Sequence, residues 1–192
     1  MKKTMVAAAL GAAAVVLILA ISGQLASTEA GKCEGALADI KKFRAAEELK
    51  PVSEEPFIVG EDELRTLQSY KGKGIVLNFW ATWCAPCIKE MPELLRLKSK
   101  VAGDGIEVLA ISQDRKDIAK VREFLEVNKL SELGVMLDKR GRLGRKLGVR
   151  GLPTTVLIDP QGRDIGRVLG IEKWDSEPVV EALRTCLTPE TS

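Results

Sequence analysis

The sequence predicts a mixed α/β fold in which helices cover both faces of one sheet. Strand-like and helix-like segments alternate from residue 74 onward, which is the pattern of βα units. The first of these strands, residues 75–80 (IVLNFW), is almost continuously apolar, as expected of a central strand covered on both faces. Near the end of the chain, Pro160-Gln161-Gly162 separates two strand-like runs and predicts a closing hairpin.

The elements ahead of the central strand are predicted from spacing and from turn residues. Apolar residues recur at helical spacing over residues 36–49 and Pro51 follows, which predicts a short helix and then a linker over 51–56. Residues 62–69 are compatible with one or two helical turns, and residues 71–74 with a tight turn.

The remaining elements follow the central strand in regular alternation. They are a helix over 84–100, a strand over 106–112, a helix over 116–128, a short strand over 135–137, a brief helix over 142–147, strands over 154–159 and 164–169, and a last helix over 176–187.

The amino terminus carries a membrane-targeting pattern. Lys2 and Lys3 precede residues 5–21, an apolar run slightly shorter than the roughly 20 residues of a spanning helix. No convincing small-x-small cleavage site follows at once, which favours an uncleaved anchor over a cleaved signal sequence. The paired lysines predict that the rest of the chain crosses the membrane, which in a bacterium places it in the periplasm as a single-pass inner-membrane protein.

Three regions are therefore expected along the chain. Residues 1–25 form a membrane anchor or signal sequence, residues 26–55 a spacer with a short helix, and residues 56–189 the folded domain.

Composition excludes several classes of function. The 29 basic residues nearly balance the 27 acidic ones, so the total charge does not indicate a nucleic-acid partner. Histidine is absent, which removes the commonest metal ligand and the commonest general base. The four cysteines are too few for a fold built from disulfides.

Two of those cysteines, Cys84 and Cys87, are three positions apart, and three uses of this spacing are considered. A zinc site needs four ligands and only Cys33 and Cys186 remain, so we expect no metal. A purely structural disulfide across so short a loop would remove little unfolded-state entropy. A redox dithiol fits best, because Cys84 follows a strand at the first turn of a helix, where free N–H groups favour the thiolate.

The helix also orders the two sulfurs. Cys87 is one turn further along on the same side and less exposed, so it can resolve a mixed disulfide formed by Cys84. Pro86 is tolerated between them because first-turn positions have no intrahelical N–H bond to lose.

At this point the chain resembles a known family. The segments WCAPC (83–87), Glu90-x-Pro92 and GLPTT (151–155) resemble the TlpA/ResA/CcmG group of thioredoxin-fold proteins, and within it the TlpA-like membrane-anchored periplasmic thiol:disulfide interchange proteins. The resemblance implies a thioredoxin fold with a central βα insertion, which would fall within residues 106–128. It also implies a thiol:disulfide oxidoreductase that needs no cofactor and mainly reduces its clients.

The resemblance assigns roles to individual residues. Cys84 matches the nucleophile and Cys87 the resolving cysteine, and Pro153 matches a cis-proline that faces them. Glu90 matches an active-site acid, which on helical spacing lies on the cysteine side and could accept and return the Cys87 proton. The alternative for Glu90 is an ordinary surface glutamate. The residues expected to face substrates are Trp83, Ala85, Pro86 and Leu152.

Three departures from related patterns affect these assignments. Asn78 occupies the position where thioredoxin has an aspartate, so a proton relay from that strand is not expected. Thr154 follows the cis-proline where CcmG-type proteins have a glutamate, which lowers the expectation of haem ligation. The family's usual hairpin ahead of the active-site strand is poorly marked in residues 56–74.

The resemblance also implies partners. Clients would be proteins with cysteine pairs that serve cytochrome oxidase copper-site assembly or, alternatively, apocytochrome c, and a membrane electron donor of the DsbD/CcdA kind would re-reduce the dithiol. A copper chaperone of the Sco kind is a remote alternative because such sites use a histidine that this chain lacks. The CxxC pair likewise disfavours a peroxide-reducing relative.

Several residues outside the motif remain to be assigned. Trp80 is expected in the core, and Trp174 is expected to serve packing. Cys33 and Cys186 are expected to form a structural disulfide, since spare cysteines commonly pair in an oxidising compartment; two free or intermolecular thiols are the alternative. Residues 139–150 carry six cations, which form either a solvated face or a docking patch for an acidic partner.

Overall fold

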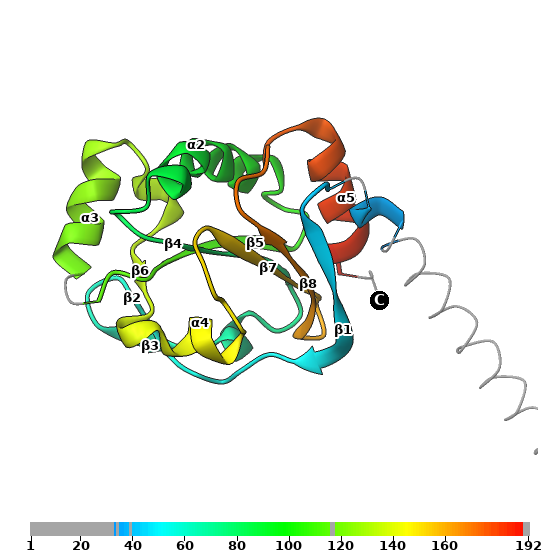
Figure 1. Cartoon of the computed structure of the whole chain (residues 1–192), viewed down its shortest axis with the longest axis horizontal. Coiled ribbons are helices and arrows are strands. Elements are labelled where there is room, and N and C mark those ends of the chain that lie inside the picture. The colour runs from blue at the N-terminus through cyan, green and yellow to red at the C-terminus, as the bar shows by residue number, and fades with distance from the viewer. Residues whose placement is uncertain (1–32, 34, 39, 116–117, 190–192) are drawn as a thin grey trace, which may run out of the picture.

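One eight-stranded sheet organises the protein, in the order β1-β8-β7-β4-β5-β6-β2-β3 (Figure 1). The structure, a computed structural model, describes residues 33, 35–38, 40–115 and 118–189. The predicted anchor at residues 1–25 lies outside these residues. Within them, no helix has the length and apolar character needed to cross a membrane.

The strands and helices have the following bounds. The strands are β1 (Phe43–Pro51), β2 (Phe57–Val59), β3 (Glu63–Arg65), β4 (Gly74–Trp80), β5 (Ile106–Ser112), β6 (Met136–Leu137), β7 (Thr154–Ile158) and β8 (Arg163–Leu169). The helices are α2 (Ala85–Lys100), α3 (Ile118–Val127), α4 (Arg142–Lys146) and α5 (Glu177–Leu187), with short 3₁₀ turns η1 (Leu67–Tyr70), η2 (Ser131–Leu133) and η3 (Lys139–Gly141).

The central strand is β4, as its apolar sequence predicts. It pairs in parallel with β5 and antiparallel with β7, and all seven of its residues are buried. Because side chains alternate along a strand, Val76 and Trp80 join one hydrophobic cluster while Ile75, Leu77 and Phe79 join another. The apolar run is therefore explained by a helix layer on each side of the sheet.

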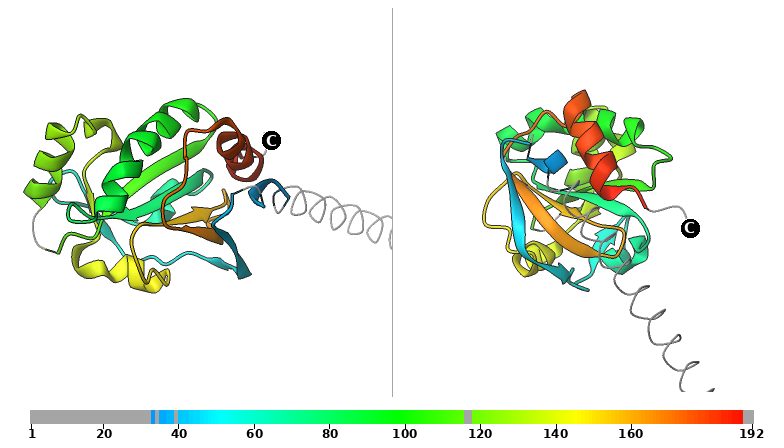
Figure 2. Two further views of the ribbon diagram at one scale, coloured as in Figure 1. Left: turned by 45° about the horizontal axis from the view of Figure 1, so that its top comes forward. Right: turned by 90° about the vertical axis from the view of Figure 1, so that its right-hand side faces the viewer.

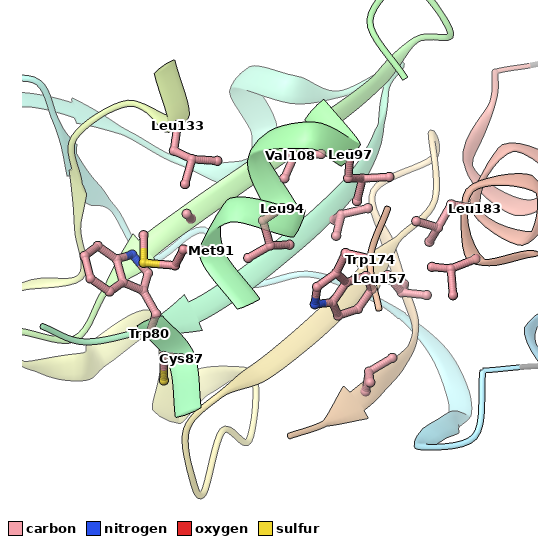
Figure 3. Close-up of a cluster of buried hydrophobic side chains, with 14 of the residues drawn as sticks. Trp80, Cys87, Met91, Leu94, Leu97, Val108, Leu133, Leu157, Trp174 and Leu183 are labelled. Carbon is pink, nitrogen blue, oxygen red and sulfur yellow. The ribbon is translucent and has the colours of Figure 1, made fainter. Parts of the chain in front are cut away.

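The two layers are unequal in size (Figures 1 and 2). The larger cluster takes Met91, Leu94 and Leu97 from α2 and further residues from α3 and α5. Figure 3 shows this cluster, with Trp174 and Leu157 packed beside α2. The smaller cluster on the other face includes Leu67 of η1 and Leu143 of α4.

The predicted helix over residues 36–49 is wrong for most of its length. Residues 43–51 form β1, which pairs antiparallel with β8, so the expected spacer at 26–55 contributes an edge strand to the sheet. The segment is rich in helix-forming Ala, Glu, Leu and Lys, but tertiary pairing overrides that propensity. Gly166 on β8 permits the pairing, since a Cβ there would lie 2.5 Å from the ring of Phe43 and 2.6 Å from the carbonyl oxygen of Arg44.

The hairpin ahead of the active-site strand is present although the sequence marks it weakly. β2 and β3 pair antiparallel around Gly60, whose φ is 68°, and β2 also pairs with β6. Both strands have only three residues, too few for a clear alternation of apolar and polar side chains. The helical turn expected within 62–69 is limited to η1, because β3 occupies residues 63–65.

A disulfide joins the start of the described chain to its last helix. Cys33 and Cys186 are paired, with their Cα atoms 4.8 Å apart and 153 positions between them in the sequence. Leu37 and Ile40, which follow Cys33, are buried in the same cluster as the apolar face of α5. The bridge therefore clips the segment that leads into β1 onto α5.

Candidate active site

Cys84 stands at the junction between β4 and α2. It is the N-cap residue of α2, with extended backbone angles (φ −93°, ψ 91°), and its N–H donates to the carbonyl of Ala81 at 3.0 Å. Ala85 and Pro86 form the first turn of the helix, where proline is favoured. The cysteine is therefore held at the amino end of a 16-residue helix.

The two sulfurs are paired in the structure, which shows the oxidised form. The Cα atoms of Cys84 and Cys87 are 5.3 Å apart, and the side chain of Cys87 is fully buried while that of Cys84 is 5% exposed. The backbone N–H of Cys87 donates to Sγ of Cys84 at 3.3 Å. A thiolate on Cys84 would be stabilised by that donor and by the positive end of the helix dipole.

The loop before Cys84 is pinned from the neighbouring strand. Asp114, just after β5, accepts hydrogen bonds from the N–H of Thr82 at 2.9 Å and from its hydroxyl at 2.8 Å. The hydroxyl of Ser112 donates to the same carboxylate at 2.6 Å. Because β4 and β5 are parallel, their carboxyl ends lie at one edge of the sheet, and this carboxylate can reach across.

The cis-proline loop lies at that same edge. The bond between Leu152 and Pro153 is cis, as the family resemblance implies, and Thr154 begins β7. The antiparallel register pairs Phe79 of β4 with Thr154, so the loop before β7 meets the end of β4 that leads into the cysteine pair. Leu152 is half-buried and lines a pocket of about 640 Å³ beside Pro153.

Glu90 is buried inside the domain, so the alternative of a surface glutamate is wrong. Its Oε1 accepts from Nδ2 of Asn78 at 2.9 Å, and its Oε2 accepts from the indole N–H of Trp174 at 2.9 Å and the backbone N–H of Glu172 at 3.4 Å. Asn78 also donates to the hydroxyl of Thr155 at 3.0 Å. Donors from β4 and from the loop before α5 thus converge on one carboxyl group carried by α2.

The environment of Glu90 changes its ionisation. Burial raises the pKa of the Glu90 carboxyl above its ordinary value, and the hydrogen bonds from Trp174 and Asn78 offset part of the rise. A carboxyl group with a raised pKa suits proton exchange with a thiol, whose own pKa is higher still.

The residues predicted to face substrates differ in exposure. Trp83 is 70% exposed, and Ala85 and Pro86 are also exposed, so these three present surface directly beside the cysteine pair in the chain. Trp80 is fully buried, as expected of a core residue.

Comparisons with known proteins agree with this geometry. The model of the AhpC/TSA family matches residues 39–163. Thiol-disulfide oxidoreductase ResA of Bacillus anthracis is 35% identical over 158 residues, which cover 81% of this chain and 86% of the relative. The chain belongs to the AhpC/TSA family, as a relative of ResA.

Other relatives support the same assignment over different spans. ResA of Bacillus thuringiensis subsp. konkukian (strain 97-27) is 43% identical over 104 residues, an alignment that spans only 59% of that relative and 54% of this chain. Among solved structures, a putative thiol:disulfide interchange protein DsbE from Chlorobium tepidum has a TM-score of 0.60 and 28% identity, covering 70% of this chain and 94% of the other. The fold is therefore thioredoxin-like.

Sequence reasoning did not identify three residues of this chain as parts of the site, namely Asn78, Trp174 and Asp114. Asn78 was considered only as a position without a proton relay. Its amide is no such relay, but it donates directly to Glu90. The alternation of side chains along β4 would have indicated this, since it places Asn78 on the face covered by α2. Trp174 and Asp114 carried no sequence signal, because they reach the site from loops distant in the chain.

Proposed function

We propose that this protein reduces disulfides in client proteins by dithiol exchange at Cys84 and Cys87. The observation that supports this most directly is the position of Cys84 at the N-cap of α2, with its sulfur accepting the N–H of Cys87 and already joined to the Cys87 sulfur. Such a site stabilises a thiolate on one cysteine and keeps the second within bonding distance.

The exchange proceeds in two steps. In the first, the Cys84 thiolate attacks one sulfur of the client disulfide; a bond forms between Cys84 and that sulfur, and the other client sulfur leaves as a thiolate that takes a proton. In the second, the deprotonated Cys87 attacks Sγ of Cys84 and releases the client's remaining sulfur. The client gains two electrons and two protons, and the Cys84–Cys87 disulfide forms.

Glu90 would serve the second step. It follows Cys87 by three positions on α2, so both side chains lie on the same side of the helix. The Cys87 sulfur is fully buried, so bulk water has poor access to its proton. A carboxylate in the same interior could take that proton as Cys87 attacks and return it when the dithiol is reduced again.

The cellular setting is part of the proposal. The apolar run at residues 5–21 after two lysines supports a single-pass anchor in the inner membrane with the domain in the periplasm. In that compartment a reductant needs a source of electrons, and a membrane donor of the DsbD/CcdA kind would supply them. By family resemblance, the clients are proteins of cytochrome oxidase copper-site assembly or apocytochrome c.

Trapping of clients tests the proposal. Cys87→Ser leaves Cys84 able to attack but removes the resolving thiol, so mixed disulfides with clients should accumulate and dissolve on reduction. The matched control is Cys84→Ser/Cys87→Ser, which should trap nothing. Mass spectrometry of the trapped partners would distinguish copper-site proteins from apocytochrome c.

Two results would contradict the proposal. One is the absence of any mixed disulfide on Cys84 in the trapping variant. The other is a reduction potential as oxidising as that of DsbA, about −120 mV, because a dithiol at that potential would oxidise clients instead of reducing them.

A further inference from the structure

Residues 139–150 connect β6 to the cis-proline loop and carry six cations. All six side chains are exposed, and we call them the basic surface: Lys139, Arg140, Arg142, Arg145, Lys146 and Arg150. The whole chain has a formal net charge of only +2, so this segment concentrates positive charge far beyond the average of the protein.

The one acid next to this segment is buried and already used. Asp138 is fully buried, and its carboxylate accepts from the backbone N–H groups of Leu143 at 3.1 Å and Gly144 at 2.8 Å, and from the side chain of Gln113 at 3.0 Å. These bonds anchor α4 onto the sheet and leave its cations pointing outward. Asp138 therefore holds the basic surface in place without neutralising it at the surface.

Few other acids compensate these cations. Among the described residues, Arg142 is the member of the basic surface that forms an ion pair, with Glu55 at 3.4 Å. Arg145 donates to the backbone carbonyl of Arg140 at 2.6 Å, which leaves its charge uncompensated. A solvated face usually mixes both signs of charge, whereas five of these six cations form no ion pair among the described residues.

The basic surface leads directly into the site. Arg150 and Arg167 line the pocket beside Pro153, together with Leu152 and the half-exposed Leu169. Arg167 is paired with Asp164 at 2.7 Å and donates to the carbonyl of Leu147, so Arg150 is the cation of this pocket left for a ligand among the described residues. The pocket thus combines apolar walls with one available positive charge, next to the loop that faces the cysteine pair.

We propose that the basic surface docks an acidic segment of the client protein beside the client's disulfide. The inference rests on the proposed function and adds a substrate class to it: clients whose cysteine pair is flanked by Asp or Glu. Charge complementarity would raise the rate of encounter and place the client's cysteines against Cys84, while the apolar walls around Leu152 accept a neighbouring apolar side chain.

Paired peptides test this inference with the full-length reduced protein. Two peptides carry the same internal disulfide loop, one flanked by three aspartates and the other by three asparagines. We expect the acidic peptide to be reduced roughly tenfold faster at low salt, and the ratio of the two rates to approach one near 1 M salt, where the screening length falls to about 3 Å.

Matched variants locate the effect. Lys146→Gln/Arg150→Gln removes two charges from the basic surface and should reduce the ratio several-fold toward one. Lys71→Gln/Lys129→Gln removes two exposed charges where β4 begins and where α3 ends, at the sheet edge opposite the cysteine pair, and should leave the ratio unchanged.

The outcomes separate this inference from the proposed function. If neither peptide is reduced, the proposed function fails. If both are reduced at the same rate at low salt, or if both double variants lower the ratio equally, dithiol exchange stands and the docking surface is refuted. Binding to phosphatidylglycerol vesicles that is lost in Lys146→Gln/Arg150→Gln, without any preference for the acidic peptide, would instead assign the surface to the membrane.

Discussion

Single residues decide the chemistry of this site through their burial and hydrogen bonds. Cys84 acquires a donor from the N–H of Cys87 because it caps a helix, and Glu90 acquires three donors because it is enclosed. Burial and hydrogen bonding act in opposite directions on the pKa of Glu90, and burial prevails. This carboxyl group therefore keeps its proton to a higher pH than an exposed glutamate does.

Glu90→Gln tests that ionisation through stability. Because burial raises the pKa of Glu90, the native chain retains this proton at pH values where the unfolded chain has released it. The corresponding stability is complete below the ordinary glutamate pKa of 4.5 and is lost as the pH rises through the native pKa. As the pH rises above 4.5, the oxidised parent should therefore lose unfolding free energy relative to Glu90→Gln in urea titrations.

The difference in unfolding free energy between the parent and Glu90→Gln controls for the other buried carboxyl groups. Burial also raises the pKa of Asp164, but Asp164 is present in both proteins, so its contribution cancels in the difference between them. Parallel pH profiles for the parent and the variant would show that the native pKa of Glu90 is not raised.

Trp174→Phe tests the hydrogen bond that orients Glu90. The substitution removes a buried N–H that donates to Oε2 of Glu90 at 2.9 Å. Trp80→Phe is the matched control, because Trp80 is equally buried and its indole N–H has no hydrogen-bond partner among the described residues. We expect Trp174→Phe to lower the unfolding free energy by about 1–3 kcal/mol more than Trp80→Phe, measured by urea denaturation.

The ionisation of Glu90 should follow the same pattern. Loss of the Trp174 donor should raise the pKa of Glu90 further, whereas Trp80→Phe should leave it unchanged. Equal losses of unfolding free energy in Trp174→Phe and Trp80→Phe would show that Trp174 contributes only packing and that its hydrogen bond to Glu90 adds no stability.

At the scale of elements, the edge strand β1 is the least expected part of the fold. Its sequence favours a helix, yet it pairs with β8 and is preceded by a segment that a disulfide attaches to α5. Most of the β1 residues are exposed, so burial alone contributes little to holding the strand. The disulfide and the close approach of Phe43 to Gly166 explain why this segment lies on the sheet.

Cys33→Ser/Cys186→Ser tests the contribution of the disulfide. A cross-link between residues 153 positions apart restricts the unfolded chain strongly, so its removal should lower the unfolding free energy by about 2–5 kcal/mol. Cys84→Ser/Cys87→Ser is the control, since its loop spans only three positions and removes far less entropy. Urea denaturation of both double variants measures the difference, and equal losses would contradict this account.

At the scale of the whole molecule, the sheet separates two hydrophobic clusters, and the active site lies where the central strand β4 ends. Alternate side chains of β4 feed two separate clusters, and the polar exception, Asn78, points to the same side as α2. The parallel register of β4 with β5 and the antiparallel register with β7 bring the cysteine loop, Asp114 and the cis-proline loop together. The basic surface leads into the last of these loops, so its cations lie at the same end of β4 as the cysteine pair.

The sequence by itself determined the features that depend on a few neighbouring residues. These are the apolar central strand, the helix that Cys84 opens, the spacing that brings Cys87 onto its partner's side, and the closing hairpin, all of which follow from local periodicity and capping. Only the tertiary structure decided the environment of Glu90 and the pairing of β1. Glu90 meets Trp174 across 84 positions, and Asn78 meets Thr155 across 77, because the fold brings distant segments together and excludes water from between them. No pattern within a short window of sequence encodes such contacts, so the ionisation of the site and the exception to helix propensity at β1 appear only when the chain is folded.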